Sequence, residues 1–319
     1  HEPYTTVLQQ MGIEVLYGAY YAKHIFEWLA KNKFEINYVF LNRPHISIKY
    51  IDFFREKTAI KTIYYGHDLH FLRNQREYEL TGDEQKKKEA EEWKQKELYL
   101  MRKADISYYP SYIEEEEIHK IDSKISVRAI TAYVYDEFKT DLQTDFSQRK
   151  GLLFVGGFRH TPNIDAVIWF AREVFPIIRQ QLDVPFYIVG SHATKEILDL
   201  DGKDGVIVKG YVSDQELSEL YEKCRVDVVP LRYGAGVKGK VVEALYNGIP
   251  IVTTSVGAEG IKAADKAMLI YDDAQNFADE TVRLYNNIEK LQMLQAETQK
   301  LIRNNFSTEA VWNIIKDDF

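Results

Sequence analysis

Residues 226–254 read VDVVPLRYGAGVKGKVVEALYNGIPIVTT, and this stretch carries the pattern that decides the fold. It begins with a short apolar run, turns through closely spaced glycines and continues with apolar residues at helical spacing. A second β-branched run follows Gly248 and Pro250. A strand, a turn, a helix and another strand in this order are typical of a βαβ unit in a parallel sheet.

The same alternation runs along the rest of the chain. Strands are predicted at 13–17, 36–41, 61–65, 106–109, 126–130, 151–155, 186–189, 206–208, 226–229, 250–253 and 267–271. Helices are predicted between them at 20–31, 86–102, 163–181, 214–223, 238–247 and 274–304. Short apolar strands separated by helices of this length predict an α/β fold whose parallel sheets are covered on both faces.

The length of the chain predicts two domains, because 319 residues exceed what one hydrophobic core usually serves. The stretch 136–150, DEFKTDLQTDFSQRK, is polar and lacks a strand pattern, and the alternation of strands and helices restarts after it. We therefore predict domains at residues 1–145 and 146–304. Residues 305–319 are predicted to form a terminal helix, with Ser307 as its N-cap, that packs back toward the first domain.

Composition excludes several classes of protein. Hydrophobic residues make up 45% of the chain and charged residues 28%, as in ordinary soluble globular proteins. The net charge of −8 argues against nonspecific binding of nucleic acid, which needs a basic face. The single cysteine, Cys224, excludes an intramolecular disulfide and zinc-finger spacing, which fits the cytoplasmic location that we predict. No apolar run approaches the length of a membrane span.

The loop with Gly234, Gly236 and Gly239 has the design of a phosphate site. Glycines before a helix let backbone N–H groups approach an anion, and the helix N-terminus adds partial positive charge. Lys238 and Lys240 add full positive charge. The glycine spacing matches that of a P-loop and that of a dinucleotide loop, but the P-loop hydroxyl is missing and the loop lies late in the second domain. A glycine turn that merely starts a helix is the alternative interpretation.

Residues 230–261 resemble the nucleotide-sugar-binding segment of family 4 (group 1) glycosyltransferases, which are retaining enzymes of the GT-B fold. The stretch 151–163, GLLFVGGFRHTPN, is similar to the start of that family's C-terminal domain. The other matches in the second half are 189–190, 210–212 and 255–260, and those in the first half, which are looser, are 43–45, 67–68 and 103–105. The resemblance implies two Rossmann-like, doubly wound domains that face a cleft.

The resemblance also implies a donor site. The family's signature is a pair of glutamates separated by seven residues. The second, which grips the ribose of the nucleotide, falls on Glu243. The first, which contacts the donor sugar, falls on Ala235 and is therefore missing. The backbone N–H groups of Gly236, Val237 and Lys238 are available in its place.

Catalytic positions are implied in the same way. The family sets an arginine and a lysine against the diphosphate in the loop after the first strand of the second domain. The alignment puts Gly157 and Pro162 there, so Arg159 and Lys240 are the predicted replacements. His67, at the end of a first-domain strand, is predicted to face the transferred sugar, and a loop histidine held by backbone groups is the alternative. The remaining donor-binding positions implied are Gly157 and Gly239, together with Tyr211 and Val212 in the base-binding loop.

The function implied is that of a retaining hexosyltransferase. It would move a sugar from a nucleotide sugar, expected to be a UDP-sugar, to a hydroxyl group of a glycan, a lipid-linked acceptor or a protein. The resemblance implies no metal ion and no cofactor besides the donor. A nucleotide-sugar epimerase and a noncatalytic nucleotide-sugar-binding module are the alternatives, and the missing first glutamate favours the latter.

The N-terminal sequence adds one more expectation. The chain begins at His1 with a short helix that leads into the predicted strand 13–17, whereas a complete first domain of this fold begins with a strand-helix-strand unit of roughly 30 residues. The first domain is therefore expected to lack its opening, and the chain to belong to a longer, multidomain protein. Peripheral association with a membrane is left open.

Overall fold

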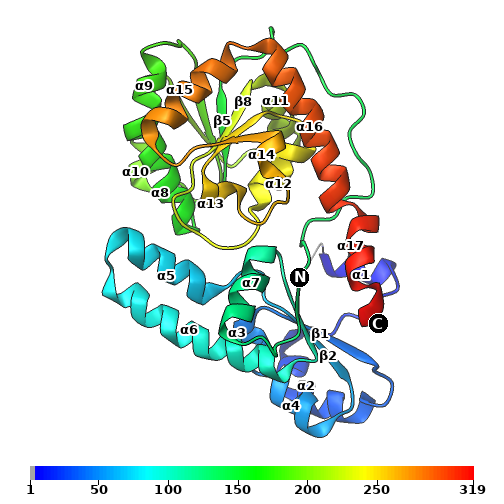
Figure 1. Cartoon of the computed structure of the whole chain (residues 1–319). Coiled ribbons are helices and arrows are strands. Elements are labelled where there is room, and N and C mark those ends of the chain that lie inside the picture. Colours follow the sequence, from blue (N-terminus) through cyan, green and yellow to red (C-terminus); the bar gives the residue numbers. More distant parts are fainter. Residues whose placement is uncertain (1–3) are drawn as a thin grey trace.

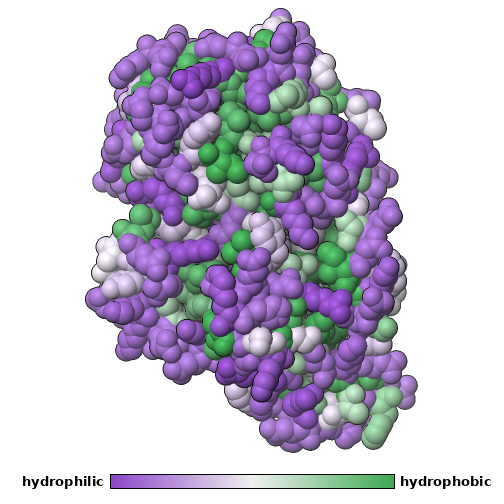
Figure 2. All heavy atoms as spheres, viewed as in Figure 1, coloured by the Kyte–Doolittle hydropathy of each residue, from purple (hydrophilic) through white to green (hydrophobic). Residues whose placement is uncertain are grey.

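The computed structural model describes residues 4–319, which form two parallel β-sheets surrounded by helices (Figure 1). The predicted α/β class, with two Rossmann-like domains, is confirmed. One sheet belongs to the first half of the chain and the other to the second half. Figure 2 shows that the viewed face is largely hydrophilic and is hollowed between these two halves.

The first sheet has the order β1-β2-β3-β4, and each pair of neighbours is parallel. Its strands are β1 (Tyr38–Asn42), β2 (Lys61–Tyr65), β3 (Ile106–Tyr109) and β4 (Val127–Ala129). Parallel strands that follow one another in chain order, joined by right-handed crossovers, place their connecting helices on one face. The helices on this side are α2 (Gly18–Asn32), α3 (Pro44–Ser47), α4 (Ile51–Lys57), α5 (His70–Thr81), α6 (Glu84–Lys103) and α7 (Tyr112–Ile121).

The second sheet has the order β10-β9-β8-β5-β6-β7, again with every pair parallel. Its strands are β5 (Leu152–Val155), β6 (Phe186–Val189), β7 (Val206–Gly210), β8 (Val226–Val229), β9 (Ile251–Thr253) and β10 (Met268–Ile270). This is the doubly wound Rossmann order, in which the chain reverses direction across the sheet between β5 and β8. Ligands of such sheets bind in the crevice outside the carboxyl ends of the strands at that reversal.

Helices cover both faces of the second sheet (Figure 1). They are α8 (Thr161–Trp169), a π-helical turn (Phe170–Val174), α9 (Phe175–Arg179), α10 (Lys195–Leu198), α11 (Asp214–Lys223), α12 (Gly239–Tyr246), α13 (Ser255–Ala258), α14 (Ala264–Ala267), α15 (Ala274–Tyr285) and α16 (Ile288–Phe306). None of the helices within residues 4–319 combines the length and the apolar character needed to cross a bilayer.

Three sequence-based assignments are corrected. Residues 13–17 form no strand: they connect α1 (Tyr4–Gln10) to α2, and Ile13 and Tyr17 are exposed. The predicted helix 274–304 is broken in two, because Asn287 accepts a hydrogen bond from the amide of Lys290 at 2.9 Å and so starts α16 as its N-cap. The predicted helix 163–181 contains the π-helical turn before Pro176, which cannot donate a helical hydrogen bond.

The terminal helix α17 (Thr308–Ile315) returns to the first sheet (Figure 1). Its N-cap is Ser307, whose hydroxyl accepts from the amide of Ala310 at 3.1 Å. Val311 and Ile315 pack against the face of the sheet that the connecting helices leave open, where Ile63, Tyr65, Ile106 and Tyr108 lie. The end of the chain therefore supplies the second cover of the first sheet.

A polar anchor holds this cover in place. Asp318, in the 3₁₀ turn Lys316–Asp318 that follows α17, is buried. Its carboxylate accepts from the Tyr108 hydroxyl at 2.6 Å and pairs with Arg128 at 2.9 Å. Lys61 donates to the backbone carbonyl of Asp318 at 2.5 Å. Three residues of the first sheet thus converge on one residue of the C-terminus.

We predict that Asp318→Ala lowers the free energy of unfolding of the first domain by about 2 kcal/mol, because two hydrogen bonds to a charged group are lost. Chemical denaturation followed by tyrosine and tryptophan fluorescence measures this change. Asp317→Ala is the matched control, since Asp317 is exposed. Equal denaturation midpoints for the two variants would contradict the anchoring role.

Candidate functional site

A cavity of about 310 Å³ lies between the two domains. The first domain contributes His67, Asp68, Arg73, Pro110, Ala132 and Tyr133. The second domain contributes the loop after β5 and the glycine loop after β8: His160, Pro162, Asn163, Leu231, Tyr233, Gly234, Ala235, Val237, Lys238, Gly239 and Lys240. The two second-domain loops leave the sheet at its point of reversal, which is where the topology predicts a ligand site.

Lys240 stands in the first turn of α12 and directs its ammonium group toward the loop after β5. Its Nζ donates to Oδ1 of Asn163 and lies 4.6 Å from the centre of the Phe154 ring. Burial lowers the pKa of Lys240 to about 7, and the carboxylate of Asp227 opposes part of this shift. Because the positive charge is poorly compensated, an anion that enters the cavity will favour the protonated form of Lys240.

Gly156, at the end of β5, allows the ammonium group to come this close. A Cβ at this position would lie 2.7 Å from Nζ of Lys240 and 2.9 Å from Nδ2 of Asn163. The Asn163 amide also donates to the carbonyl of Gly157 at 2.7 Å, which holds the loop onto the start of α8. A residue without a side chain is therefore required at 156 by close packing, not by backbone conformation.

The glycine loop leads into α12 without a side-chain cap. Gly234 and Gly236 have φ of 147° and 71°, values that favour glycine. The backbone N–H of Gly239 donates to the hydroxyl of Tyr133, a residue of the first domain whose pKa is raised by burial. Since no carboxylate caps the helix, its N-terminus keeps the partial positive charge that attracts anions.

His67 reaches the cavity from the end of β2. Its φ of 68° is unusual for a residue with a side chain, and such strain is often found at functional sites. Its Nε2 lies 2.5 Å from Oδ1 of Asn42, which orients the ring. Burial and the charge of Arg43 lower the pKa of His67, so the imidazole is neutral at pH 7. Beside it, Asp68 pairs with Arg73 at 2.5 Å.

Glu243 lies on α12, three residues after Lys240, but does not line this cavity. It is half-buried, and its pKa is raised by burial and by the negative charge of Asp214 at the start of α11. This position places a carboxyl group in the first half of α12, on the side of α11.

The structure brings some predicted site residues together and leaves others apart. His67, Val237, Lys238, Gly239 and Lys240 line the cavity, and Gly236 belongs to the same loop. Gly157 contacts Asn163 at its edge. Arg159 is exposed and does not line it. In the loop after β7, Tyr211 is 78% exposed, and Val212 packs against the core of the second domain.

Several cavity residues are not among the site residues that the sequence predicts. They are Arg73, Tyr133, His160 and Asn163. Their common signal is position: each lies in or soon after a loop that follows the carboxyl end of a parallel strand. That signal identifies candidates but does not tell which side chains turn inward.

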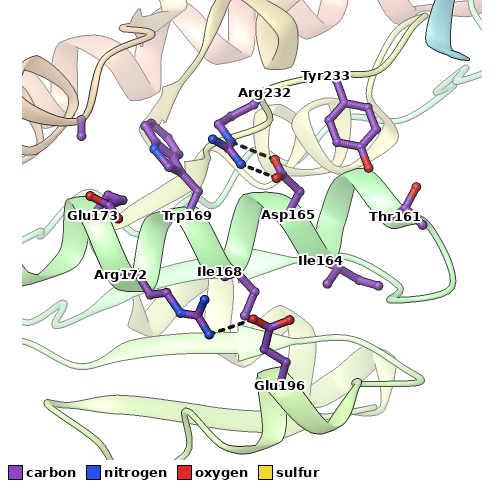
Figure 3. Close-up of a pocket in the computed structure, with 11 residues that line it drawn as sticks. Thr161, Ile164, Asp165, Ile168, Trp169, Arg172, Glu173, Glu196, Arg232 and Tyr233 are labelled. Carbon is purple, nitrogen blue, oxygen red and sulfur yellow. Dashed lines mark hydrogen bonds and ion pairs between the residues drawn. The ribbon is translucent and has the colours of Figure 1, made fainter. Parts of the chain in front are cut away.

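A second hollow, of about 610 Å³, lies along α8 outside the cleft (Figure 3). Figure 3 shows Arg232 facing Asp165 and Arg172 facing Glu196. The corresponding distances are 2.9 Å from Nε of Arg232 to Asp165 and 2.8 Å from Nη2 of Arg172 to Glu196. These arginines are already paired with carboxylates, so the hollow offers no free cation to a phosphate group.

No group of three or more histidine, cysteine, aspartate or glutamate side chains within the described part of the chain is arranged to hold a metal ion. The titratable groups that line the cavity are two lysines, the Asp68–Arg73 pair, two tyrosines and two histidines, His67 and His160, whose pKa values are lowered by burial. This arrangement suits an anionic ligand, which the lysines and the helix N-terminus attract directly.

Comparison with known proteins agrees with this description. Residues 149–287 match the family model described as "Glycosyl transferases group 1". A protein of Klebsiella pneumoniae described as an uncharacterized 44.6 kDa protein in the cps region is 26% identical over 172 residues, which cover 51% of this chain and 44% of that protein. The chain thus spans less than half of this relative.

Solved structures share the fold across both domains. A mutant of S. aureus TarM, in complex with Fondaparinux, alpha-GlcNAc-glycerol and UDP, is 16% identical with a TM-score of 0.69, covering 92% of this chain and 57% of that chain. Sucrose-phosphate synthase from Thermosynechococcus elongatus is 16% identical with a TM-score of 0.70, covering 92% and 76%. Anabaena Alr3699/HepE, in complex with UDP and glucose, is 13% identical with a TM-score of 0.68, covering 99% and 88%.

The two sheets and the cavity between them define a protein of the GT-B fold class. Within this class, residues 149–287 match the glycosyl transferases group 1 model. The predicted resemblance to group 1 glycosyltransferases of this fold is confirmed.

We predict that Gly156→Ala weakens binding of UDP several-fold while the melting temperature changes little. The added methyl group meets the ends of the Lys240 and Asn163 side chains, which can turn away while the backbone of the fold stays in place. Isothermal titration calorimetry measures the affinity. Gly157→Ala is the matched comparison, because its Cβ would meet only Oγ of Ser191 at 3.7 Å, and a smaller loss is expected. Equal losses in both variants would contradict the close-approach argument.

The lowered pKa of Lys240 predicts a pH dependence. Above pH 7 the free protein must take up a proton at Lys240 to bind a diphosphate, so the affinity for UDP should fall as the pH rises from 7 to 9, by up to about tenfold per unit. Lys240→Met should bind UDP more weakly and show a flatter profile. Titrations in buffers of different ionisation enthalpy report the proton uptake directly. An identical slope in both proteins would show that Lys240 is not the titrating group.

Proposed function

We propose that this chain forms the donor-binding and catalytic part of a retaining glycosyltransferase that uses a nucleotide sugar. The observation that carries the proposal is the cavity between the domains, where Lys240, the uncapped N-terminus of α12 and the glycine loop meet His67 of the other domain. Residues 149–287, which match the group 1 glycosyltransferase model, contribute Lys238 and Lys240 to this cavity. The chain spans less than half of the Klebsiella pneumoniae relative, so the activity of the whole protein is also a proposal.

A uridine diphosphate sugar is the proposed donor. TarM and HepE, which share the fold, were crystallised with UDP, and the pneumococcal O-GlcNAc transferase GtfA with UDP and GlcNAc. In this chain, the diphosphate would lie between Lys240 and the amides of the glycine loop. The ribose would lie beside Glu243, and the base near Tyr211 and Val212. The sugar would extend toward His67.

The chemistry follows from the charges in the cavity. As the bond between the anomeric carbon and the diphosphate breaks, negative charge grows on the leaving oxygens and positive charge on the sugar ring. Lys240 and the oriented amides stabilise the leaving group without reorganisation. Because Nε2 of neutral His67 donates to Oδ1 of Asn42, its Nδ1 can accept a hydrogen bond from a sugar hydroxyl without adding a charge that opposes the developing cation.

We propose that the anomeric configuration is retained through a front-face mechanism. In this mechanism, the acceptor oxygen forms its bond to the anomeric carbon on the side that the diphosphate leaves. The acceptor proton passes to a diphosphate oxygen, so no enzyme nucleophile is needed. Lys240 and the N-terminus of α12 supply positive charge that a metal ion supplies in other transferases. We therefore propose that transfer is independent of a metal ion. The exposed Arg159 is close enough in the chain to Gly157 to join the diphosphate site if its loop moves.

The acceptor is proposed to be a hydroxyl group of a glycan, a lipid-linked glycan or a protein. We further propose a cytoplasmic enzyme within a longer multidomain protein, with peripheral membrane association where the acceptor is lipid-linked. We propose that the choice among these acceptors depends on the first domain, which contributes His67, Asp68 and Arg73 to the cavity.

A donor screen tests the proposal. The protein, incubated with UDP-sugars and GDP-sugars, is expected to release free UDP from one of the UDP-sugars, either by transfer or by slow hydrolysis, and mass spectrometry detects it. Epimerised sugar without release of the nucleotide would instead support an epimerase. Tight UDP binding without turnover of any donor, with acceptor-containing cell extract supplied, would support the noncatalytic module.

A variant of Glu243 tests the proposed contact of this residue with the ribose. Glu243→Ala should weaken UDP binding about tenfold, through lost hydrogen bonds to the ribose. It should leave the affinity for inorganic pyrophosphate unchanged, because the diphosphate contacts lie elsewhere. Glu289→Ala, at an exposed position on α16, is the control. Wild-type UDP affinity in Glu243→Ala would remove this residue from the site.

A further inference from the structure

Two carbonyl groups of the glycine loop are held by cations. Nη1 of Arg76 donates to the carbonyl of Gly234 at 2.7 Å, and Nζ of Lys238 donates to the carbonyl of Gly236. Arg76 belongs to α5 of the first domain, so its bond to Gly234 crosses the cleft. Lys238 belongs to the loop itself.

These two contacts fix the direction of the neighbouring amides. In a planar trans peptide, the carbonyl of one residue and the N–H of the next point in opposite directions. The N–H groups of Ala235 and Val237 are therefore directed away from Arg76 and Lys238. Within residues 4–319 neither N–H has an acceptor in the protein, and both residues line the cavity. Unpaired amides of one loop that lines a cavity can form a site for an anion.

Arg76 is itself held in place by the second domain. The same Nη1 that bonds to Gly234 also donates to Oε2 of Glu259 at 2.5 Å. Glu259 follows α13, its side chain is 8% exposed, and its other carboxylate oxygen has no partner in the described part of the protein. Because a buried carboxylate needs a partner, the pair is costly to break. The guanidinium group is thus clamped between the loop and α13.

Glu114 of the first domain lies next to the glycine loop at Gly236. It is fully buried at the start of α7, and its Oε1 accepts from the amide of Leu69 at 2.8 Å. A Cβ at Gly236 would lie 3.5 Å from both of its carboxylate oxygens and 3.4 Å from the carbonyl of His67. Besides Tyr133 at Gly239, the first domain therefore touches the loop through Arg76 at Gly234 and through the Glu114 region at Gly236.

We propose that Arg76 is a positioning residue for the donor. By holding the carbonyl of Gly234, it turns the amide of Ala235 into the cavity, where this amide can bind a phosphate oxygen of a nucleoside diphosphate. The identity of the ligand rests on the proposed function, whereas the orientation of the loop does not. Ala235 can thereby serve the site without a carboxylate: its backbone contributes, and a side chain of the other domain orients it.

The test compares arginine variants in the full chain. Arg76→Met keeps the length of the side chain and removes its donors, and it is expected to weaken UDP binding about tenfold in calorimetry. Arg76→Lys should fall between Arg76→Met and wild type, because a lysine retains charge and donors but lacks the planar geometry. Arg102→Met is the matched control, since Arg102 pairs with Asp122 at 2.9 Å within the first domain. Its UDP affinity should remain within twofold of wild type.

A readout that needs no ligand separates this proposal from the proposed function. Hydrogen–deuterium exchange with mass spectrometry should show faster exchange in peptides covering residues 232–240 of Arg76→Met, and unchanged exchange there in Arg102→Met. Wild-type exchange in those peptides, or wild-type UDP affinity in Arg76→Met, would overturn the proposal. If the wild-type protein binds no UDP, the proposed function fails, and the exchange data still decide whether Arg76 orders the loop.

Discussion

Every pair of neighbouring strands in both sheets is parallel, and the position of the site depends on this constraint. Parallel strands all end at the same edge of a sheet, so the loops that follow them gather there. The loop with His67 follows β2 of the first sheet, and the glycine loop follows β8 of the second. When the two carboxyl edges face one cavity, residues from distant parts of the chain can act on a single ligand.

The electrostatics of the cavity follow from its burial. The pKa of Lys238 and the pKa of Lys240 are both lowered because desolvation disfavours their ammonium groups. Acids nearby offset only part of this loss: Asp227 acts on Lys240, and Glu259 on Lys238. Cations held in this way destabilise the empty protein and gain the most from an anionic ligand. The uncapped N-terminus of α12 adds to the same attraction.

Much of the fold could be predicted from local patterns. Ten of the predicted strands coincide with strands of the two sheets, because apolar runs between helices are recognisable in the sequence. The stretch 13–17 has a similar composition but no neighbouring strand with which to pair, and strand pairing is not a local property. Pro176 and Asn287 interrupt helices whose apolar periodicity continues past them.

The site was predictable only where it is local. The glycine loop and Lys240 are close in sequence, and their spacing before a helix indicates phosphate chemistry. Tyr133, Asn163 and Arg76 give no such signal. Arg76 contacts Gly234, which lies 158 positions further along the chain, and Lys240 contacts Asn163 from 77 positions away.

The sequence by itself therefore determined the α/β class, the alternation of strands and helices, and the glycine loop before α12, because each depends on residues within a few turns of one another. The tertiary structure decided which first-domain side chains reach that loop, and that α17 covers the first sheet through Asp318. It also decided that Arg159 and Tyr211 stay outside the cavity. These outcomes depend on the tertiary packing of elements from distant parts of the chain, and hydrophobic periodicity does not predict that packing.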